Sequence, residues 1–408
     1  MANALNGVRV VELSNFLAGP LAAMYLGDFG ADVVKVEKPD GGDEGRLWGR
    51  AKDGVGLYFK VVNRNKRSVT ADLRTPIGVE IVKRLTTNAD VVIENYRPGT
   101  LERWGLGYEE LSRDNPGLIM LRVSGFGQTG PYRHRPGFGT LAEAFSGYAY
   151  ITGFPDREPL LPAFGLADET TGLHGAFLTM VALKAREVTG QGQEIDLAIY
   201  ESLYTLLGPQ VVEYDQLGVV QERDGSRLAF TAPRNIYRTR DGQYVSISGS
   251  GQRTFERICA ALGRPDLPHD PRFRDNRTRI EHVEALDAEL QALVGTHDRA
   301  DLLDLFDRHQ ATVAPVYSVA DTFEDPHYVA RENVVRLDDD QLGQVGMQGV
   351  VGRLSSTPGE IRSAGPSVGE HNEEVLLGEL GFTMEELRTG GWQSEVKPLP
   401  SDLRTTPV

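Results

Sequence analysis

Hydrophobic and polar positions in the first part of the chain form short apolar runs that alternate with longer periodic segments. The runs VRVVEL (residues 8–13) and DVVKVEK (residues 32–38) are rich in β-branched residues and predict buried strands. Between them, a segment with Pro20 near its first turn predicts a helix that stops at Gly30. This part of the chain therefore reads as strand, helix, strand.

The same order repeats further along. An amphipathic helix is expected over residues 75–85, where it starts at a Thr-Pro pair, and the apolar strand ADVVIEN (residues 89–95) follows. Helical turns over residues 100–113 then lead to the strand LIMLRVS (residues 118–124). Strands that alternate with helices at this spacing predict an α/β fold with a parallel, doubly wound sheet.

Beyond residue 220 the pattern changes. The polar stretch QERDGSR (residues 221–227) is typical of a crossing between domains, and NIYRTRDGQYVSIS (residues 235–248) predicts a β-hairpin with a two-residue turn at Asp241-Gly242. The helices expected next are Thr254–Leu262, Arg277–Val294 and Arg299–His309. The expected domains are residues 1–220 (large domain), 225–325 (small α+β domain) and 326–408 (return to the large domain, with an extended tail after about residue 389 that holds Pro398, Pro400 and Pro407).

Length and composition limit the class of protein. A chain of 408 residues is too long for one ordinary core and suits two domains. The net charge of −15 argues against nucleic acid as a partner, so any anionic ligand must be held by a local group of cations. Cys259 is the single cysteine, which excludes an intrachain disulfide and favours a reducing, cytoplasmic location. No apolar run approaches the length of a membrane span, so no membrane partner is expected.

Two glycine-rich stretches resemble the dinucleotide-binding pattern. GFGQTG (residues 125–130) follows a predicted strand, as a nicotinamide site requires. That pattern binds a pyrophosphate only when it opens a helix, whereas Pro131 and a polar segment follow here. GFGTLA (residues 137–142) lacks a preceding strand. GFGQTG is therefore interpreted as a loop, and GFGTLA is the weaker match of the two.

Lysines and arginines are concentrated in one part of the chain. The segment KVVNRNKRSVTADLR (residues 60–74) holds five of them, and Lys35, Lys38, Arg97 and Arg103 lie near predicted strand ends. A charge run of this kind is commonly a solvated surface. Loops at the carboxyl ends of strands in a doubly wound sheet line the ligand crevice, however. The cations are therefore interpreted as a pocket for a phosphorylated ligand.

Asp168 lies between an apolar run and a helix rich in small residues. Its type and position fit a helix N-cap, with Glu169 in the first turn. Gly172 and Gly175 keep one face of this helix narrow, so backbone or a ligand must approach closely there. His174 is interpreted as a packing residue. None of the histidines has a metal-ligand spacing, and no metal site is predicted.

Several segments together resemble the family III CoA-transferases, which include formyl-CoA transferase and the carnitine and bile-acid CoA-transferases. The resemblance covers nearly the whole chain. It implies a Rossmann-like large domain built from both ends of the chain, an inserted small domain, and a homodimer of two interlocked subunits. The segments that carry it are LNGVRVVELSNFLAGP, GADVVKVEKPDGGDEGR, NRNKRSVTADL, IENYRPGTLERWGLG, GFGQTGP, ADETTGLHGAFLTMVALKAREVTGQGQEIDLAIYESL and GEHNEEVL.

The resemblance also implies a reaction. The nucleophilic aspartate of the family falls on Asp168, which would attack an acyl-CoA thioester to give a mixed anhydride. The CoA thiolate would then form an enzyme thioester, and an incoming carboxylic acid would leave as the new acyl-CoA. CoA is thus a substrate, with no permanently bound cofactor. Water must be kept out for the thioester energy to be conserved.

The CoA contacts of the family also map onto this chain. Leu17 and Gly139 depart from formyl-CoA transferase, which has a glutamine and an acid there, so formate and oxalate are not expected as substrates. Glu143 is a possible residue of the acceptor site, or it pairs with an arginine. GSGQ (residues 249–252) is a short substitute for the glycine run of formyl-CoA transferase. The expected CoA-binding residues are Ala18, Lys38, Ala71, Asp72, Leu73, Arg74, Asn95, Tyr96, Arg97, Arg103, Gly137 and Phe138.

Two other functions stay open at this point. The α-methylacyl-CoA racemases share the fold and the CoA pocket, but their paired bases include a histidine in a G-H-D stretch where this chain has Phe138 and Gly139. His134 lies close in sequence but outside that motif. A non-catalytic CoA-binding protein is the second alternative. Basic and hydroxyl groups near the expected pocket make a dicarboxylate such as succinate a plausible donor acid.

Overall fold

A computed structural model of the chain describes residues 3–392, so the expected tail with Pro398, Pro400 and Pro407 lies outside the described residues. The chain divides into two compact units. The first consists of the chain up to Tyr148, of Leu161–Val219 and of the described chain from Ala330 onward. The second consists of Ala149–Leu160 and Val220–Val329.

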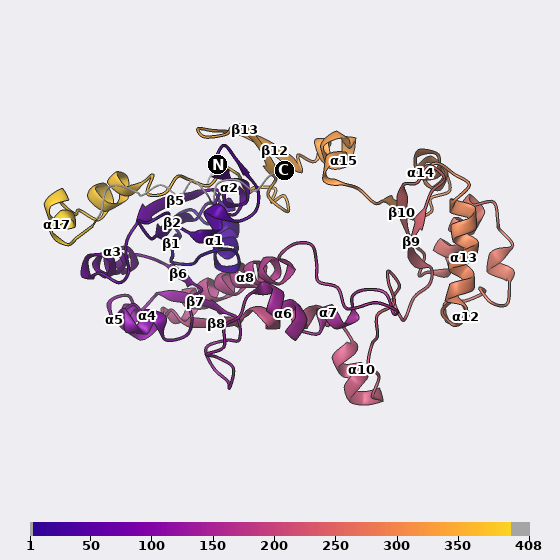
Figure 1. Cartoon of the computed structure of the whole chain (residues 1–408), viewed down its shortest axis with the longest axis horizontal. Helices are drawn as coiled ribbons and strands as arrows, with labels where there is room; N and C mark the ends of the chain where they lie inside the picture. Colours follow the sequence, from indigo (N-terminus) through magenta and orange to yellow (C-terminus); the bar gives the residue numbers. More distant parts are fainter. Residues whose placement is uncertain (1–2, 393–408) are drawn as a thin grey trace. The chain divides into compact units, whose positions relative to one another are not determined.

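A six-stranded sheet forms the centre of the first unit (Figure 1). Its strands are β1 (Arg9–Glu12), β2 (Asp32–Glu37), β5 (Lys66–Thr70), β6 (Val91–Glu94), β7 (Ile119–Ser124) and β8 (Glu194–Ala198). They are ordered β5-β2-β1-β6-β7-β8, and every neighbouring pair is parallel. The predicted α/β fold with a parallel central sheet is confirmed. The chain builds outward from β1 in one direction and then crosses to β6, so the switch point of the topology lies between β1 and β6.

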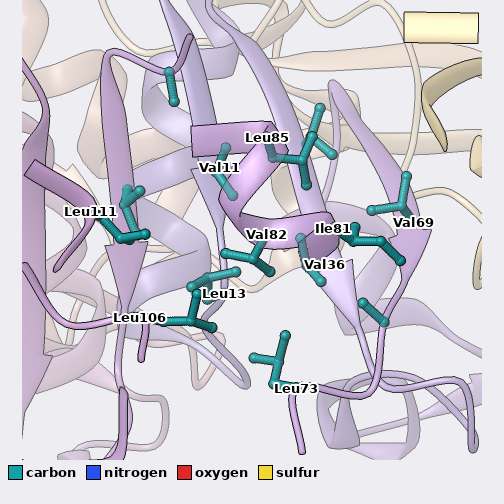
Figure 2. Close-up of a cluster of buried hydrophobic side chains, with 14 of the residues drawn as sticks. Val11, Leu13, Val36, Val69, Leu73, Ile81, Val82, Leu85, Leu106 and Leu111 are labelled. Carbon is teal, nitrogen blue, oxygen red and sulfur yellow. The ribbon is translucent and has the colours of Figure 1, made fainter. Parts of the chain in front are cut away.

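Helices cover both faces of this sheet because alternate strand residues point to opposite sides. Val11 belongs to the core under α3 (Pro76–Thr87) and α5 (Tyr108–Asp114), whereas its neighbour Val10 belongs to the core under α1 (Ala18–Asp28) and α8 (Leu166–Thr189). Figure 2 shows Ile81, Val82 and Leu85 of α3 above the strands. The helix predicted over residues 75–85 is confirmed, and the Thr75 hydroxyl caps it by accepting from the Gly78 N–H.

The remaining elements of the first unit are short. They are β3 (Ala51–Lys52), β4 (Val55–Gly56), α2 (Leu57–Val62), α4 (Thr100–Arg103), α6 (Gly139–Phe145), α9 (Ile199–Tyr204), α10 (Gln210–Leu217), β12 (Val334–Asp339), β13 (Gly343–Gln348) and α17 (Met384–Thr389), with α7 (Tyr148–Ile151) and α16 (Pro326–Ala330) at the boundaries between units. The helix expected to stop at Gly30 is α1, which ends at Asp28, two residues before that glycine.

The return of the chain to the first unit closes one edge of the sheet. The His371 N–H donates to the Ser68 oxygen, and its ring Nδ1 accepts from the Ser68 N–H at 3.2 Å. The Asn372 side-chain oxygen accepts from the Thr70 N–H at 2.8 Å. The motif GEHNEEVL thus occupies the polar backbone groups of the edge strand β5, which would otherwise be open for pairing.

The second unit is a small α+β assembly. Its elements are β9 (Arg234–Arg238), β10 (Tyr244–Ser248), β11 (Val313–Pro315), α11 (Gln252–Ala261), α12 (Asn276–Glu281), α13 (Val283–Val294), α14 (Arg299–Arg308) and α15 (Val319–Glu324). The β9–β10 hairpin is present, but the predicted two-residue turn is wrong. The Thr239 N–H donates to the Gln243 oxygen, which leaves three loop residues, and Gly242 has φ +80°.

The helix predicted over Arg277–Val294 is also corrected. It is broken at His282, which ends α12 and precedes α13. Among residues 3–392, no helix is both long enough and apolar enough to cross a membrane.

Candidate active site

The loops after β1 and β6 meet at the switch point of the sheet. The Asn15 N–H donates to the side-chain oxygen of Asn95 at 2.8 Å, and the Asn95 amide donates back to the Asn15 oxygen at 2.7 Å. A cavity of about 920 Å³ opens at this point, within the first unit. Its volume lies in the range of small-molecule sites. Its wall also includes the start of α6, residues 161–165 and Asp168.

Asp168 does not cap α8, contrary to the N-cap interpretation. The helix begins at Leu166 with Gly165 as its N-cap residue, so Asp168 lies inside the first turn. Within residues 3–392 its carboxylate has neither a hydrogen-bond donor nor a cation as partner. Burial, followed by the charges of Glu143 and Glu169, raises the pKa of Asp168 to about 7. The cavity therefore has an unpaired carboxyl group in its wall that titrates near neutral pH.

Glu143 comes from α6 and is buried beside this group. Its Oε1 accepts a hydrogen bond from the Ala167 N–H at 3.3 Å, in the first turn of α8. Burial raises the pKa of Glu143, and the backbone N–H groups of Ala167 and Leu166 oppose that rise. Among the described residues no arginine pairs with Glu143, so the expected alternative of an arginine pair does not hold.

Gly139 provides the space that Asp168 occupies. A β-carbon at Gly139 would lie 2.0 Å from Oδ2 of Asp168, and one at Gly165 would lie 3.5 Å from the same oxygen. Real β-carbons do not approach an oxygen to 2.0 Å, so any side chain at Gly139 would displace the Asp168 carboxylate. The acid that formyl-CoA transferase has at this position would therefore overlap the Asp168 carboxylate as it lies in this chain.

The small residues of α8 serve helix packing rather than ligand approach. A β-carbon at Gly172 would lie 2.6 Å from the Leu21 β-carbon, and one at Gly175 would lie 3.2 Å from the Ala22 β-carbon. Both Leu21 and Ala22 belong to α1. The narrow face predicted from the sequence is real, but it is the backbone of α1 that approaches it.

A fully buried ion network lies beneath the cavity. Lys35 Nζ is 2.7 Å from Glu12 and 2.9 Å from Asp43, and Lys66 Nζ is 2.7 Å from Glu12. The other oxygen of Asp43 accepts from the Phe16 N–H at 3.0 Å. The network thus joins the loops that follow β1 and β2. It holds Phe16 at φ +62°, a conformation that is costly for a bulky residue and is found where structure constrains function.

Most cations of residues 60–74 are structural, which corrects their interpretation as a phosphate pocket. Lys60 pairs with Asp339 at 2.7 Å, and Arg64 pairs with Asp28 at 2.6 Å. Like Lys66, both are buried, because these residues face other parts of the unit rather than the carboxyl ends of the strands. Only Arg74 of this segment is exposed after the end of β5.

The expected CoA-binding residues fall into two groups. Those in the cavity wall are Asn95, Tyr96, Gly137 and Phe138. The others lie outside the wall. Four of them are exposed cations that follow the carboxyl ends of β2, β5 and β6, namely Lys38, Arg74, Arg97 and Arg103. The remaining four are Ala18, Ala71, Asp72 and Leu73. Lys38 pairs with Glu44, and Arg74 pairs with Asp72 at 2.8 Å.

The cavity also contains residues that the sequence did not single out. Phe16, Trp48 and Tyr58 line it, and the Tyr58 hydroxyl donates to Glu169 at 3.1 Å. Burial and the nearby Glu169 raise the pKa of Tyr58. No local pattern marks these three residues, because their loops come together only through the ion network and the packing of α2.

Neither histidine considered from the sequence is in the cavity wall. His174 Nδ1 lies 3.1 Å from the Thr170 oxygen of its own helix, and His134 is exposed beside Arg133. The stretch GFGQTG does form a loop, and the next helix begins only at Gly139. Within residues 3–392 no group of three or more His, Cys, Asp or Glu side chains is arranged to hold a metal ion.

Comparison with known proteins gives consistent matches over most of the chain. The sequence profile of CoA-transferase family III matches residues 5–372. The chain is 45% identical over 384 residues to the succinyl-CoA–D-citramalate CoA-transferase of Chloroflexus aurantiacus, covering 94% of this chain and 96% of that protein. It is 36% identical to the succinate–glutarate CoA-transferase of Agrobacterium fabrum, covering 91% and 94% of the two chains.

A solved structure resembles this fold closely. It is the crystal structure of a CAIB/BAIF family protein from Brucella suis, with a TM-score of 0.83 and 37% sequence identity. The match covers 93% of this chain and 100% of the other.

Proposed function

The chain belongs to CoA-transferase family III, and from this we propose that it moves CoA from an acyl-CoA donor to a free carboxylic acid through a covalent intermediate on Asp168. The observation that carries the proposal is the unpaired carboxylate of Asp168 in the wall of the cavity at the switch point. A carboxylate without a cation or hydrogen-bond donor keeps its electron pairs available for attack.

The proposed reaction proceeds by exchange of bonds at three carbonyl carbons: that of the donor, Cγ of Asp168 and that of the acceptor. An oxygen of Asp168 attacks the thioester carbon of the donor, the C–S bond breaks, and CoA leaves as its thiolate. The thiolate attacks Cγ of Asp168 and expels the donor acid, which leaves an aspartyl–CoA thioester. The acceptor carboxylate attacks Cγ and releases the thiolate. That thiolate then attacks the acceptor acyl carbon and frees the Asp168 carboxylate.

The arrangement of the expected CoA-binding residues supports this assignment. Lys38, Arg74, Arg97 and Arg103 are exposed near the carboxyl ends of their strands, where cations suit the phosphates of the nucleotide end of CoA. The thioester end would enter the cavity along Asn95, Tyr96 and the Gly137–Phe138 segment. CoA takes part as a substrate and not as a resident cofactor.

The acyl groups are proposed from the relatives. The similar proteins are named for succinyl-CoA or succinate together with a second dicarboxylic acid. We therefore propose succinyl-CoA as donor and a dicarboxylic acid as acceptor. The described residues of the cavity wall offer hydroxyl groups, such as those of Tyr58 and Thr140, but they include no lysine, arginine or histidine.

The interlocked homodimer implied by the sequence resemblance is also proposed. The outer face of α8 exposes large apolar side chains, among them Leu173, Phe177, Met180 and Val181. A patch of this kind is typical of an interface between proteins. A second copy of the chain is the occupant that the family resemblance implies.

Trapping of the intermediate tests the proposed function. The purified protein is incubated with succinyl-CoA and hydroxylamine, and the tryptic peptides are analysed by mass spectrometry. We expect a hydroxamate on Asp168 and its loss in Asp168→Asn. Glu187→Gln, at the exposed far end of the same helix, is the matched control and should behave as the wild type. Undiminished turnover in Asp168→Ala would rule out the covalent mechanism.

A racemase is the second candidate, and one experiment separates it. The described cavity wall has Phe138 and Gly139 where racemases carry their histidine, so one of the two bases is missing. In deuterium oxide with a chiral 2-methylacyl-CoA, we expect no exchange at the α-carbon without an acceptor acid. A non-catalytic CoA-binding protein would give neither exchange nor a hydroxamate.

A further inference from the structure

The first turn of α8 has no N-cap side chain of its own. Gly165 occupies the N-cap position, so the first N–H groups of the helix would lack a partner from the helix itself. The Ala167 N–H is instead bonded to the carboxylate of Glu143, which comes from a different helix. Glu143 therefore acts as the capping side chain of α8 from outside.

This arrangement decides what Asp168 can do. Asp168 lies in the same turn, where the N–H groups and the helix dipole ordinarily stabilise a carboxylate. Because Glu143 already accepts from the Ala167 N–H, that donor is occupied. The negative charge of Glu143 also offsets the positive end of the α8 helix dipole. Asp168 consequently remains without a donor and faces the cavity.

We propose that Glu143 is a positioning residue that occupies the first-turn amide of α8 and so keeps the neighbouring Asp168 carboxylate unpaired, exposed to the cavity and reactive. The inference rests on the proposed function, because it explains how Asp168 becomes a nucleophile. It assigns Glu143 a role through Asp168 and not through contact with the acceptor acid, which differs from the role expected from the sequence.

The chemical consequence concerns the energy of the acyl intermediate. A more basic carboxylate is a stronger nucleophile toward the thioester. It is also a poorer leaving group, so its mixed anhydride is less activated and lies closer in energy to the thioester from which it forms. A carboxylate stabilised by the helix amides would lose both advantages.

Three titratable groups face Asp168 and must be considered together. They are Glu143 from α6, Glu169 of the same helix turn and the Tyr58 hydroxyl from α2. Burial raises the pKa of Glu143 as well as that of Asp168, and the charge of Glu143 further raises the pKa of Asp168. The test must therefore report on Asp168 itself.

The experiment uses two variants of the full-length protein. Glu143→Gln keeps an oxygen that can accept from the Ala167 N–H but removes the charge, whereas Glu143→Ala removes both. Glu187→Gln, which leaves the first turn of α8 unchanged, is the control. Infrared difference spectroscopy with ¹³C-labelled aspartate, referenced to Asp168→Asn, reports the titration of Asp168 without any substrate. Single-turnover release of succinate from succinyl-CoA, without an acceptor acid, reports the acylation of Asp168 as a function of pH.

In Glu143→Gln we expect the titration of Asp168 and the midpoint of the acylation profile to move down by about one pH unit. In Glu143→Ala, Asp168 turns to the freed amide, and acylation at pH 8 falls by about 10²-fold. A titration of Asp168 in Glu143→Ala that coincides with the titration in Glu143→Gln overturns the proposal, because loss of the amide contact would then change nothing beyond the loss of charge. A shifted titration in a protein that is never acylated supports the role of Glu143 and refutes the proposed function.

Discussion

At the scale of the residue, the chemistry of the site is set by what surrounds Asp168. Withdrawal from water disfavours the charged form of a carboxyl group, and the nearby charges of Glu143 and Glu169 act in the same direction. Within the described residues no cation compensates. The cluster thus differs from the buried network of Lys35, in which each charge has an opposite partner.

The raised pKa of Asp168 predicts how acylation depends on pH. The protonated carboxyl group is not a nucleophile, so the acylation rate should rise with pH through about 7 and level off above it. Below the midpoint the rate should fall by about tenfold for each pH unit. Single-turnover release of succinate from succinyl-CoA across this range, without an acceptor acid, measures the profile. A midpoint near 3.8, the ordinary value for aspartate, would contradict the role of burial.

The close approach at Gly139 predicts a second effect. In Gly139→Ala the new methyl group would overlap Oδ2 of Asp168, so the carboxylate must rotate away from the cavity. We expect acylation of Asp168 to fall by at least about 10²-fold, since a displacement of about 1 Å is that costly in an active site. Gly117→Ala is the control, because a β-carbon at Gly117 has its nearest neighbour at 3.6 Å. Equal acylation in the two variants would contradict the geometry.

At the scale of the element, α8 has a different partner on each side. Its glycines lie against α1, its first turn is capped from α6, and its outer apolar face is exposed in the single chain. The orientation of Asp168 therefore depends on the depth at which α8 packs on α1. A change in the packing of the helix is expected to reach the carboxylate.

The variant Gly172→Ala tests this dependence. The β-carbon of the new alanine would lie 2.6 Å from the β-carbon of Leu21. Because a β-carbon is attached directly to the backbone, rotation of the Leu21 side chain could not relieve this overlap. We expect a loss of about 1–3 kcal/mol in the free energy of unfolding, measured by urea titration. Glu187→Ala, on the exposed side of α8, should change stability by less than about 0.5 kcal/mol. A neutral Gly172→Ala would show that the helices are not in tight contact.

At the scale of the whole molecule, the acidic charge of the chain bears on how it would bind an anionic ligand. The net charge of −15 repels anions in general, and in the proposed function the exposed cations Lys38, Arg74, Arg97 and Arg103 offset that repulsion for the phosphates of CoA. Removal of one of these charges should weaken CoA binding chiefly at low salt, since exposed charges are screened.

The exposed apolar face of α8 predicts the state of the protein in solution. We expect light scattering after size-exclusion chromatography to give a mass of twice the 44.8 kDa of one chain. Phe177→Glu should weaken this association, because it introduces a charge into the patch around Leu173 and Met180. Arg113→Glu, exposed on α5 at the opposite face of the sheet, is the control. A monomer at micromolar concentration would contradict the proposed dimer.

Much of the fold was determined by the sequence itself. The alternation of apolar runs and amphipathic segments is a local property, and it predicted the parallel sheet and the helix capped by Thr75. The segment ADETTG likewise directed attention to Asp168, and the glycines of its helix predicted a close approach. These features depend on residue type and spacing within a short stretch, which a sequence displays directly.

Tertiary structure decided the rest, because it depends on residues far apart in the chain. The partners of Lys60 and Arg64 lie 279 and 36 positions away, so the sequence could not separate buried ion pairs from a ligand site. The residue type of Asp168 fitted a helix cap while the family resemblance implied a nucleophile, and in the fold it is Glu143 of another helix that accepts from the first-turn amide. Only the folded chain brings an acid of one helix to the first turn of the next, and that contact leaves Asp168 free.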